Sequence, residues 1–175
     1  LAFLGPYHDG FPSSAWPASH VISELHFYLI LPALLIFVKT HGAIYLVGLL
    51  AVFLLARWAV WLSDYSIQFL SYTTIFGRMD EFLAGMLVAV SLLDPKYTRI
   101  TNGRVTAGTL CIGSALAILL LYWWFDANGG FHHFGNKPWP SPSHIWIYLP
   151  TIEAVLFALL VWGYVSVPTT RSPNV

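Results

Sequence analysis

Ionisable side chains are rare in this sequence, and several of them lie within or beside long apolar stretches. The 175 residues include only 8 Lys and Arg, 8 Asp and Glu, and 7 His. A charged side chain at membrane depth is costly, so such residues usually face the interior of a helix bundle or a water-filled cavity and mark function. These residues are therefore the first candidates for chemistry.

The first candidate cluster runs from His20 to Tyr28. On a helix, His20, Glu24 and Tyr28 are four residues apart and share one face, whereas His26 points elsewhere. A carboxylate near a histidine could form a proton-transfer pair or hold a cationic partner. The alternative is a solvated helix end, where polar residues cost little.

The second candidate cluster contains Arg78, Asp80 and Glu81. Arg78 can pair with Glu81 or reach across to Glu24 on the first apolar helix. The alternative to direct chemistry is a structural ion pair that clamps two helices together. Gly85 and Ala89 follow as two small residues four apart, which permits close packing of helices.

Two further ionisable residues lie within apolar stretches. Arg57 is flanked by Trp58 and Trp61, and we interpret it as a side chain that snorkels to the outer membrane interface. Glu153 follows Pro150 by about one helical turn. Because proline frees nearby carbonyls and a buried carboxyl needs a donor, we interpret Glu153 as a structural residue whose partner the sequence does not identify.

The histidines outside these clusters do not indicate a metal site. His132, His133 and His144 lie in one polar stretch, but their spacing matches no common zinc site. The sequence contains no glycine-rich phosphate loop and no hydrolase or metalloprotease motif. With a net charge of zero, it also shows no bias toward nucleic acid.

The composition identifies the environment of these residues. Hydrophobic residues make up 57% and charged residues 9%, against roughly 25% charged residues in soluble domains. A soluble fold could not cover its surface with so few charges, whereas lipid solvates an apolar surface. The sequence therefore predicts an all-α, polytopic bundle of transmembrane helices.

The apolar stretches predict about five membrane spans within a single domain over residues 1–175. The predicted spans are 21–38, 43–62, 77–93, 105–125 and 145–165. The span at 77–93 is the least regular, because its uncharged part is shorter than the ~20 residues that a helix needs to cross a bilayer. Residues 63–77 are expected to form an interfacial or re-entrant stretch, and Pro32 is expected to kink the first helix.

The basic residues predict the orientation of these spans. With five spans, one side of the membrane holds the cations Lys39, Lys96, Arg99, Arg104 and Arg171. Loop cations favour the cytoplasm, so this side is predicted to be cytoplasmic. The sequence therefore predicts an integral, multi-pass membrane protein.

Three stretches of the sequence also resemble a known family. Ser23-Glu24-Leu-His26-Phe27-Tyr28, followed by Pro32, resembles the first of its helix motifs, although the tryptophan of that motif is absent where His20 and Val21 stand. Phe76-Gly-Arg78-Met-Asp80-Glu81, followed by Gly85, resembles the second, and Pro150-Thr-Ile-Glu153 is similar to a run in some members. The family is the acyltransferase-3 family of membrane O-acyltransferases, and the stretches occur in its order.

The resemblance implies an enzyme that moves an acyl group, commonly acetyl from acetyl-CoA as co-substrate, to a hydroxyl of a carbohydrate or a lipid-linked sugar. It implies a bacterial inner membrane, no bound cofactor, and a catalytic base N-terminal to this sequence. The chain would then be an internal or C-terminal fragment that is inactive alone. Glu24 and Arg78 would shape the intramembrane cavity or orient the base.

A segment of a transporter or channel is the alternative interpretation. Proline-kinked helices, here with Pro32 and Pro150, and intramembrane charges also occur in such proteins.

Overall fold

A computed structural model of the chain describes residues 16–63, 66–93, 104–136 and 141–166, and every element in these ranges is helical. The long helices are α1 (Trp16–His41), α2 (Ile44–Leu62), α4 (Ile75–Leu93), α6 (Arg104–Ala127) and α8 (Ile145–Ser166). The short elements are α3 (Ile67–Thr73), α7 (Gly130–His133) and the 3-10 helix η3 (Phe134–Asn136). The prediction of an all-α bundle is confirmed.

Among the described helices, four are long and apolar enough to cross a membrane. These segments are Ser23–His41, Ile44–Leu62, Thr106–Ala127 and Ile145–Ser166. Helix α4 has the same length as α2 but carries Arg78, Asp80 and Glu81 in its first two turns. The helix predicted at 77–93 therefore exists, and that it crosses the membrane stays a prediction.

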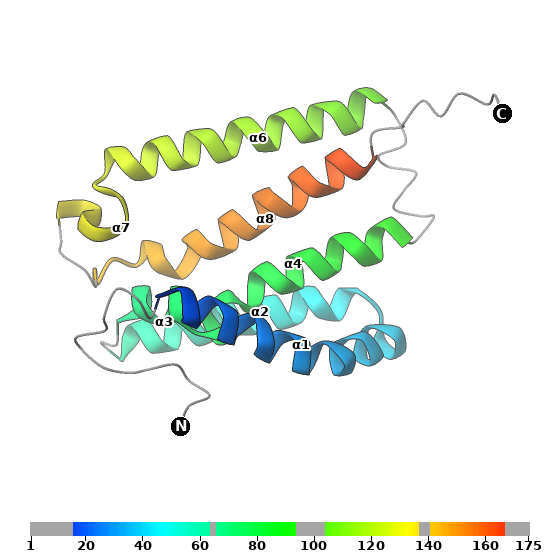
Figure 1. Cartoon of the computed structure of the whole chain (residues 1–175), viewed down its shortest axis with the longest axis horizontal. Helices are drawn as coiled ribbons and strands as arrows, with labels where there is room; N and C mark the ends of the chain where they lie inside the picture. Colours follow the sequence, from blue (N-terminus) through cyan, green and yellow to red (C-terminus); the bar gives the residue numbers. More distant parts are fainter. Residues whose placement is uncertain (1–15, 64–65, 94–103, 137–140, 167–175) are drawn as a thin grey trace.

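The long helices alternate in direction along the bundle (Figure 1). The α1–α2 turn, the last turn of α4 and the last turn of α8 lie at one end, and α3 and α7 lie at the other. The last turn of α1 places Lys39 at the first of these ends, as expected for five alternating spans. The other cations of the orientation prediction, apart from Arg104 at the start of α6, lie outside the described residues.

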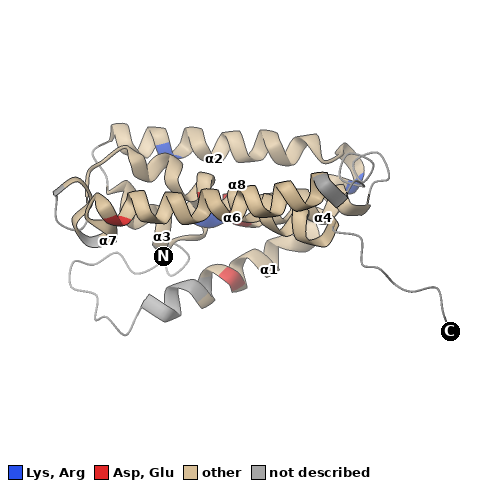
Figure 2. Ribbon diagram, turned by 90° about the horizontal axis from the view of Figure 1, so that it is seen from above, with Lys and Arg blue, Asp and Glu red and all other residues tan. Residues whose placement is uncertain are grey.

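Helix α8 lies between α6 and α4 and packs extensively against both (Figure 1). The approach to α6 is close because Gly163 has no side chain: a Cβ there would stand 2.7 Å from the backbone nitrogen of Cys111. Helices α1, α2 and α4 share an apolar core that includes Phe27, Leu46 and Leu83. Most of the ribbon carries no charged residue (Figure 2), as a lipid-facing bundle requires.

The connection from α3 to α4 is a tight corner. The Thr74 hydroxyl accepts a hydrogen bond from the Gly77 amide at 3.3 Å, the side-chain cap that a helix start favours, and donates one to the Leu70 carbonyl at 2.8 Å. A methyl group on Gly77 would overlap the backbone of Leu70 and Ser71. Gly77 therefore lets the first turn of α4 rest directly on α3.

The predicted close packing at Gly85 and Ala89 is wrong for the described helices. Both residues are exposed, and a Cβ on Gly85 would meet no atom within 4 Å. The small residues that bring helices together are Gly77 and Gly163, each of which faces the backbone of a neighbouring helix.

Aromatic rings close the end of the bundle that holds α3 and α7. Trp146, fully buried at the start of α8, packs edge-on against Tyr72, Phe125, Phe131 and Phe134. Gln68 of α3 adds polar contacts, donating to the Phe131 carbonyl at 2.7 Å and accepting from the Ser141 amide at 2.6 Å. This end of the bundle is therefore a fixed platform for the side chains described below.

Replacing Gly77 with alanine should destabilise the bundle by about 1–3 kcal/mol, because overpacking forces α3 away from α4. The measurement is unfolding of the purified protein in detergent micelles, followed by circular dichroism. The matched control is Gly48→Ala on α2, where a Cβ meets no atom within 4 Å. Equal stability of both variants would contradict the tight α3–α4 contact.

Candidate functional site

Arg57 of α2 is a charged residue that the bundle buries almost completely, with a side chain that is 2% exposed. Its two terminal nitrogens donate to the two carboxylate oxygens of Asp80 on α4, each at 2.9 Å. The Thr151 hydroxyl of α8 accepts from Arg57 at 3.1 Å and donates to Asp80 at 2.6 Å. The guanidinium also donates to the carbonyls of Ile147, at 3.1 Å, and of Gly77. Three long helices are thus tied together at one point.

The interpretation of Arg57 as a snorkelling side chain is therefore wrong. Snorkelling places the charged head in water, whereas here the carboxylate of Asp80, itself 1% exposed, neutralises it inside the bundle. An ion pair does clamp two helices together, but it joins Arg57 to Asp80, a pairing that the sequence did not predict. Arg78 pairs with Glu81 within α4, which is the first of the two pairings expected for it.

Pro150 explains why α8 can accept hydrogen bonds from its neighbours. Proline has no amide hydrogen, so the carbonyl of Trp146, one turn earlier, loses its helical partner. The Ser71 hydroxyl of α3 donates to that carbonyl at 3.0 Å. A neighbouring helix thus satisfies the carbonyl that proline leaves without a helical partner, as apolar surroundings require.

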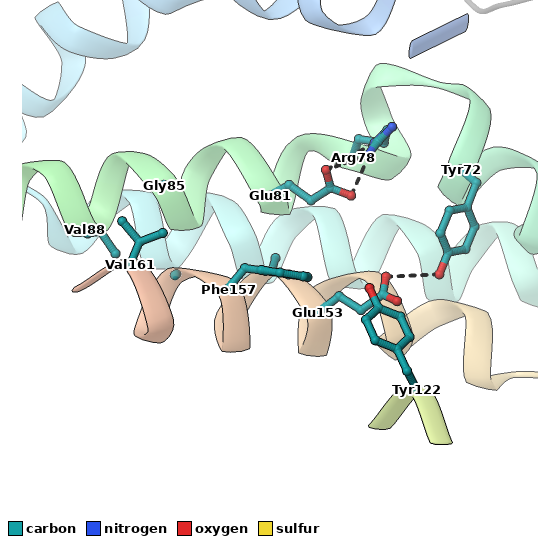
Figure 3. A pocket seen from close by; sticks show the side chains of 11 residues that line it. Tyr72, Arg78, Glu81, Gly85, Val88, Tyr122, Glu153, Phe157 and Val161 are labelled. Carbon is teal, nitrogen blue, oxygen red and sulfur yellow. Dashed lines mark hydrogen bonds and ion pairs between the residues drawn. The ribbon is translucent and has the colours of Figure 1, made fainter. Parts of the chain in front are cut away.

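A cavity of about 470 Å³ lies beside this clamp, between α4 and α8 (Figure 3). Side chains of α3 and α6 complete its wall. Its lining residues are Tyr72, Arg78, Glu81, Gly85, Val88, Tyr122, Glu153, Ala154, Phe157, Ala158 and Val161. Its volume is that of a typical small-molecule site.

One end of the cavity is polar. The Tyr72 hydroxyl donates to a carboxylate oxygen of Glu153 at 3.3 Å, and Arg78 pairs with Glu81 at 2.8 Å. Figure 3 shows Tyr122 of α6 pointing toward Glu153 as well. Burial, and then the nearby Glu153 carboxylate, raise the pKa of the Tyr72 phenol, so it remains a proton donor. The expectation that Glu153 needs a donor is confirmed, and the donor is Tyr72.

The other end of the cavity is apolar. Glu153, Phe157 and Val161 follow one another at intervals of four residues and form one face of α8. Gly85 and Val88 face them from α4 (Figure 3). Phe157, Val161 and Gly85 are exposed, so the cavity opens on the side of the bundle.

The structure separates the predicted candidates into two groups. Arg78, Glu81 and Glu153 line the cavity, and Asp80 lies in the neighbouring clamp. Glu24 and Tyr28 are exposed on α1 and do not line the cavity, and His26 is half-buried. The side chain of His20 lies outside the described part of the structure. The predicted role of Glu24 stays a prediction.

Of the other predicted histidines, His133 and His144 do not line the cavity, and the side chain of His132 lies outside the described part of the structure. His133 and His144 are exposed, and the His144 ring packs against Trp61. Among the described residues, no three His, Cys, Asp or Glu side chains are arranged to hold a metal ion.

Sequence reasoning missed Tyr72, Tyr122 and Thr151. Tyr72 and Tyr122 lie in segments whose composition resembles many other apolar helices, and Thr151 lies in the Pro150-Thr-Ile-Glu153 run, where no role was assigned to it. The available signal was Pro150, because a proline inside a span implies that a neighbouring helix supplies donors.

Comparisons of the chain with protein-family models, with curated proteins and with solved structures find no match. The fold and the site define a helical membrane protein with a cavity that is polar at one end and apolar at the other.

Replacing Arg57 with methionine should lower the free energy of unfolding by about 3–5 kcal/mol, because Asp80 is then left buried without a counter-charge. Adding Asp80→Leu to this variant should recover part of the loss. The control is Arg78→Met, whose pair with Glu81 is 24% and 31% exposed and should contribute ~1 kcal/mol or less. The measurement is unfolding in micelles, and equal losses for Arg57→Met and Arg78→Met would contradict the clamp.

Proposed function

We propose that this chain is part of an integral membrane O-acyltransferase of the acyltransferase-3 type, acting in a bacterial inner membrane. The resemblance implies that the acyl group is acetyl, which comes from acetyl-CoA and goes to a hydroxyl of a carbohydrate or a lipid-linked sugar. The observation that carries the proposal is the polar end of the cavity. It is built from Arg78 and Glu81 of one family-like stretch and Glu153 of another.

Acyl transfer makes defined demands on such a site. The acceptor O–H bond gives up its proton to a base, its oxygen forms an ester bond with the acyl carbon, and the thioester C–S bond breaks. The thiolate of coenzyme A leaves and takes up a proton. The site must therefore orient a hydroxyl and stabilise the negative oxygen that develops on the acyl carbonyl.

The cavity residues match these demands. Glu153 is held by Tyr72 and has carboxylate lone pairs to accept a hydrogen bond from the acceptor hydroxyl. The guanidinium of Arg78, held in place by Glu81, can donate a hydrogen bond to the developing oxyanion. The base itself is proposed to lie N-terminal to this sequence, so Glu153 is a positioning residue.

A transporter segment is the competing proposal, and the same cavity, which lies beside a helix that contains a proline, supports it. The two proposals differ in what a defective protein fails to do. Loss of an acyl ester from the cell surface supports the enzyme, whereas failure to accumulate a solute without ester loss supports the transporter.

Replacing Glu153 with glutamine in the full-length protein should lower acyl transfer by roughly 10–100-fold, because a misoriented hydroxyl reacts slowly. The measurement is transfer of labelled acetyl from acetyl-CoA to the acceptor in isolated membranes. The matched control is Asp126→Asn, an exposed carboxylate on α6 that does not line the cavity, and it should retain the normal rate.

The same assay decides the roles that the resemblance gives to Glu24 and Arg78. Arg78→Ala should lower the rate, since Arg78 lines the cavity. If Glu24→Gln and Arg78→Ala both kept normal transfer rates, neither residue would shape the site, and the proposed function would lose its support from these residues.

A further inference from the structure

The apolar end of the cavity has the direction and surroundings of a hydrocarbon chain in a bilayer. It follows α8 from Glu153 to Val161, about 12 Å at 1.5 Å per residue, and α4 from Glu81 to Val88. Because these helices run along the length of the bundle (Figure 1), the cavity runs parallel to them and opens sideways past Phe157 and Val161. A lipid chain could enter from the side without leaving an apolar environment.

The polar end of the cavity restricts the head group that could accompany such a chain. Its ionisable side chains include two carboxyl groups, Glu81 and Glu153, and one guanidinium, Arg78, which is already paired with Glu81. No excess positive charge is therefore present in the lining to bind a phosphate or carboxylate. Carboxylate oxygens accept hydrogen bonds, so a head group with hydroxyl donors fits this end.

We propose that the cavity binds a neutral lipid whose head group carries hydroxyls, with one hydrocarbon chain in its apolar end. The head group contacts Glu153 and Tyr72, and the chain lies between Val88, Phe157 and Val161. This inference rests on the cavity and not on the proposed acyl transfer, so it holds whether the lipid is a substrate or a resident ligand.

Gly85 sets the width of the apolar end. It lines the cavity from α4, and a Cβ there would meet no atom within 4 Å. We therefore expect a larger side chain at this position to extend into the space that the proposed chain occupies. Gly85→Leu is therefore a variant that removes the chain site without disturbing the packing of helices.

The experiment uses the purified protein in nanodiscs with a monoacylglycerol whose chain carries a photoreactive diazirine. Cross-links should be saturable, and peptide mapping should place them on the α4 and α8 segments that contain Val88, Phe157 and Val161. Gly85→Leu should lower this cross-linking at least tenfold. The matched control is Gly48→Leu on α2, an exposed glycine with equal free space around its Cβ, and it should bind as the unmodified protein does.

A second probe tests the head group. The fatty acid with the same diazirine chain carries a carboxylate in place of the hydroxyls, and it should label the cavity at least tenfold less. Equal labelling by both probes would overturn the proposed head group. Unsaturable labelling on all exposed helix faces, unchanged by Gly85→Leu, would mean ordinary contact with bulk lipid and would overturn the site. Both readouts are independent of acyl transfer, so a failure here leaves the proposed function untouched.

Discussion

The buried pair of Arg57 and Asp80 is the constraint on which the rest of the bundle depends. A lone guanidinium or carboxylate is very costly away from water, so each residue supplies the opposite charge that the other needs inside the bundle. The pair draws α2 and α4 together, and Thr151 adds α8 through two short hydrogen bonds. Because the carbonyls of Ile147 and Gly77 also accept from Arg57, the first turn of α8 and the first turn of α4 are held at the same point.

The clamp and Gly77 together determine where the cavity lies. Gly77 seats α4 on α3, which brings Tyr72 toward the cavity, and the clamp fixes α8, which carries Glu153. Further along, the small residues Gly85, Ala154 and Ala158 line the cavity and leave space between α4 and α8. The polar end is therefore rigid and the apolar end is open, as a site for a molecule with a polar head and an apolar tail requires.

Composition and apolar length predicted the helices well, because lipid demands long apolar segments and leaves few alternatives. The α2 helix, for example, ends at the predicted residue, Leu62. Such reasoning could not predict which side chains pair with one another between helices. The tryptophans beside Arg57 indicated a position at the membrane–water interface. Whether Asp80 is within reach of Arg57 depends on how α2 is rotated relative to α4, which the sequence does not show. For the same reason Gly85 was expected to be a packing position, although its side of α4 faces the cavity.

Asp80 and Glu81 show how neighbouring acidic residues come to have different roles. Successive residues on a helix point about 100° apart, so Asp80 faces Arg57 and Thr151 while Glu81 faces the cavity. Asp80 is buried against Arg57, whereas Glu81 remains partly exposed in the cavity and holds Arg78. A substitution at Asp80 therefore acts on the stability of the bundle, and one at Glu81 acts on the cavity. Activity lost at Asp80 alone would thus report on folding, not on a direct contact with a ligand.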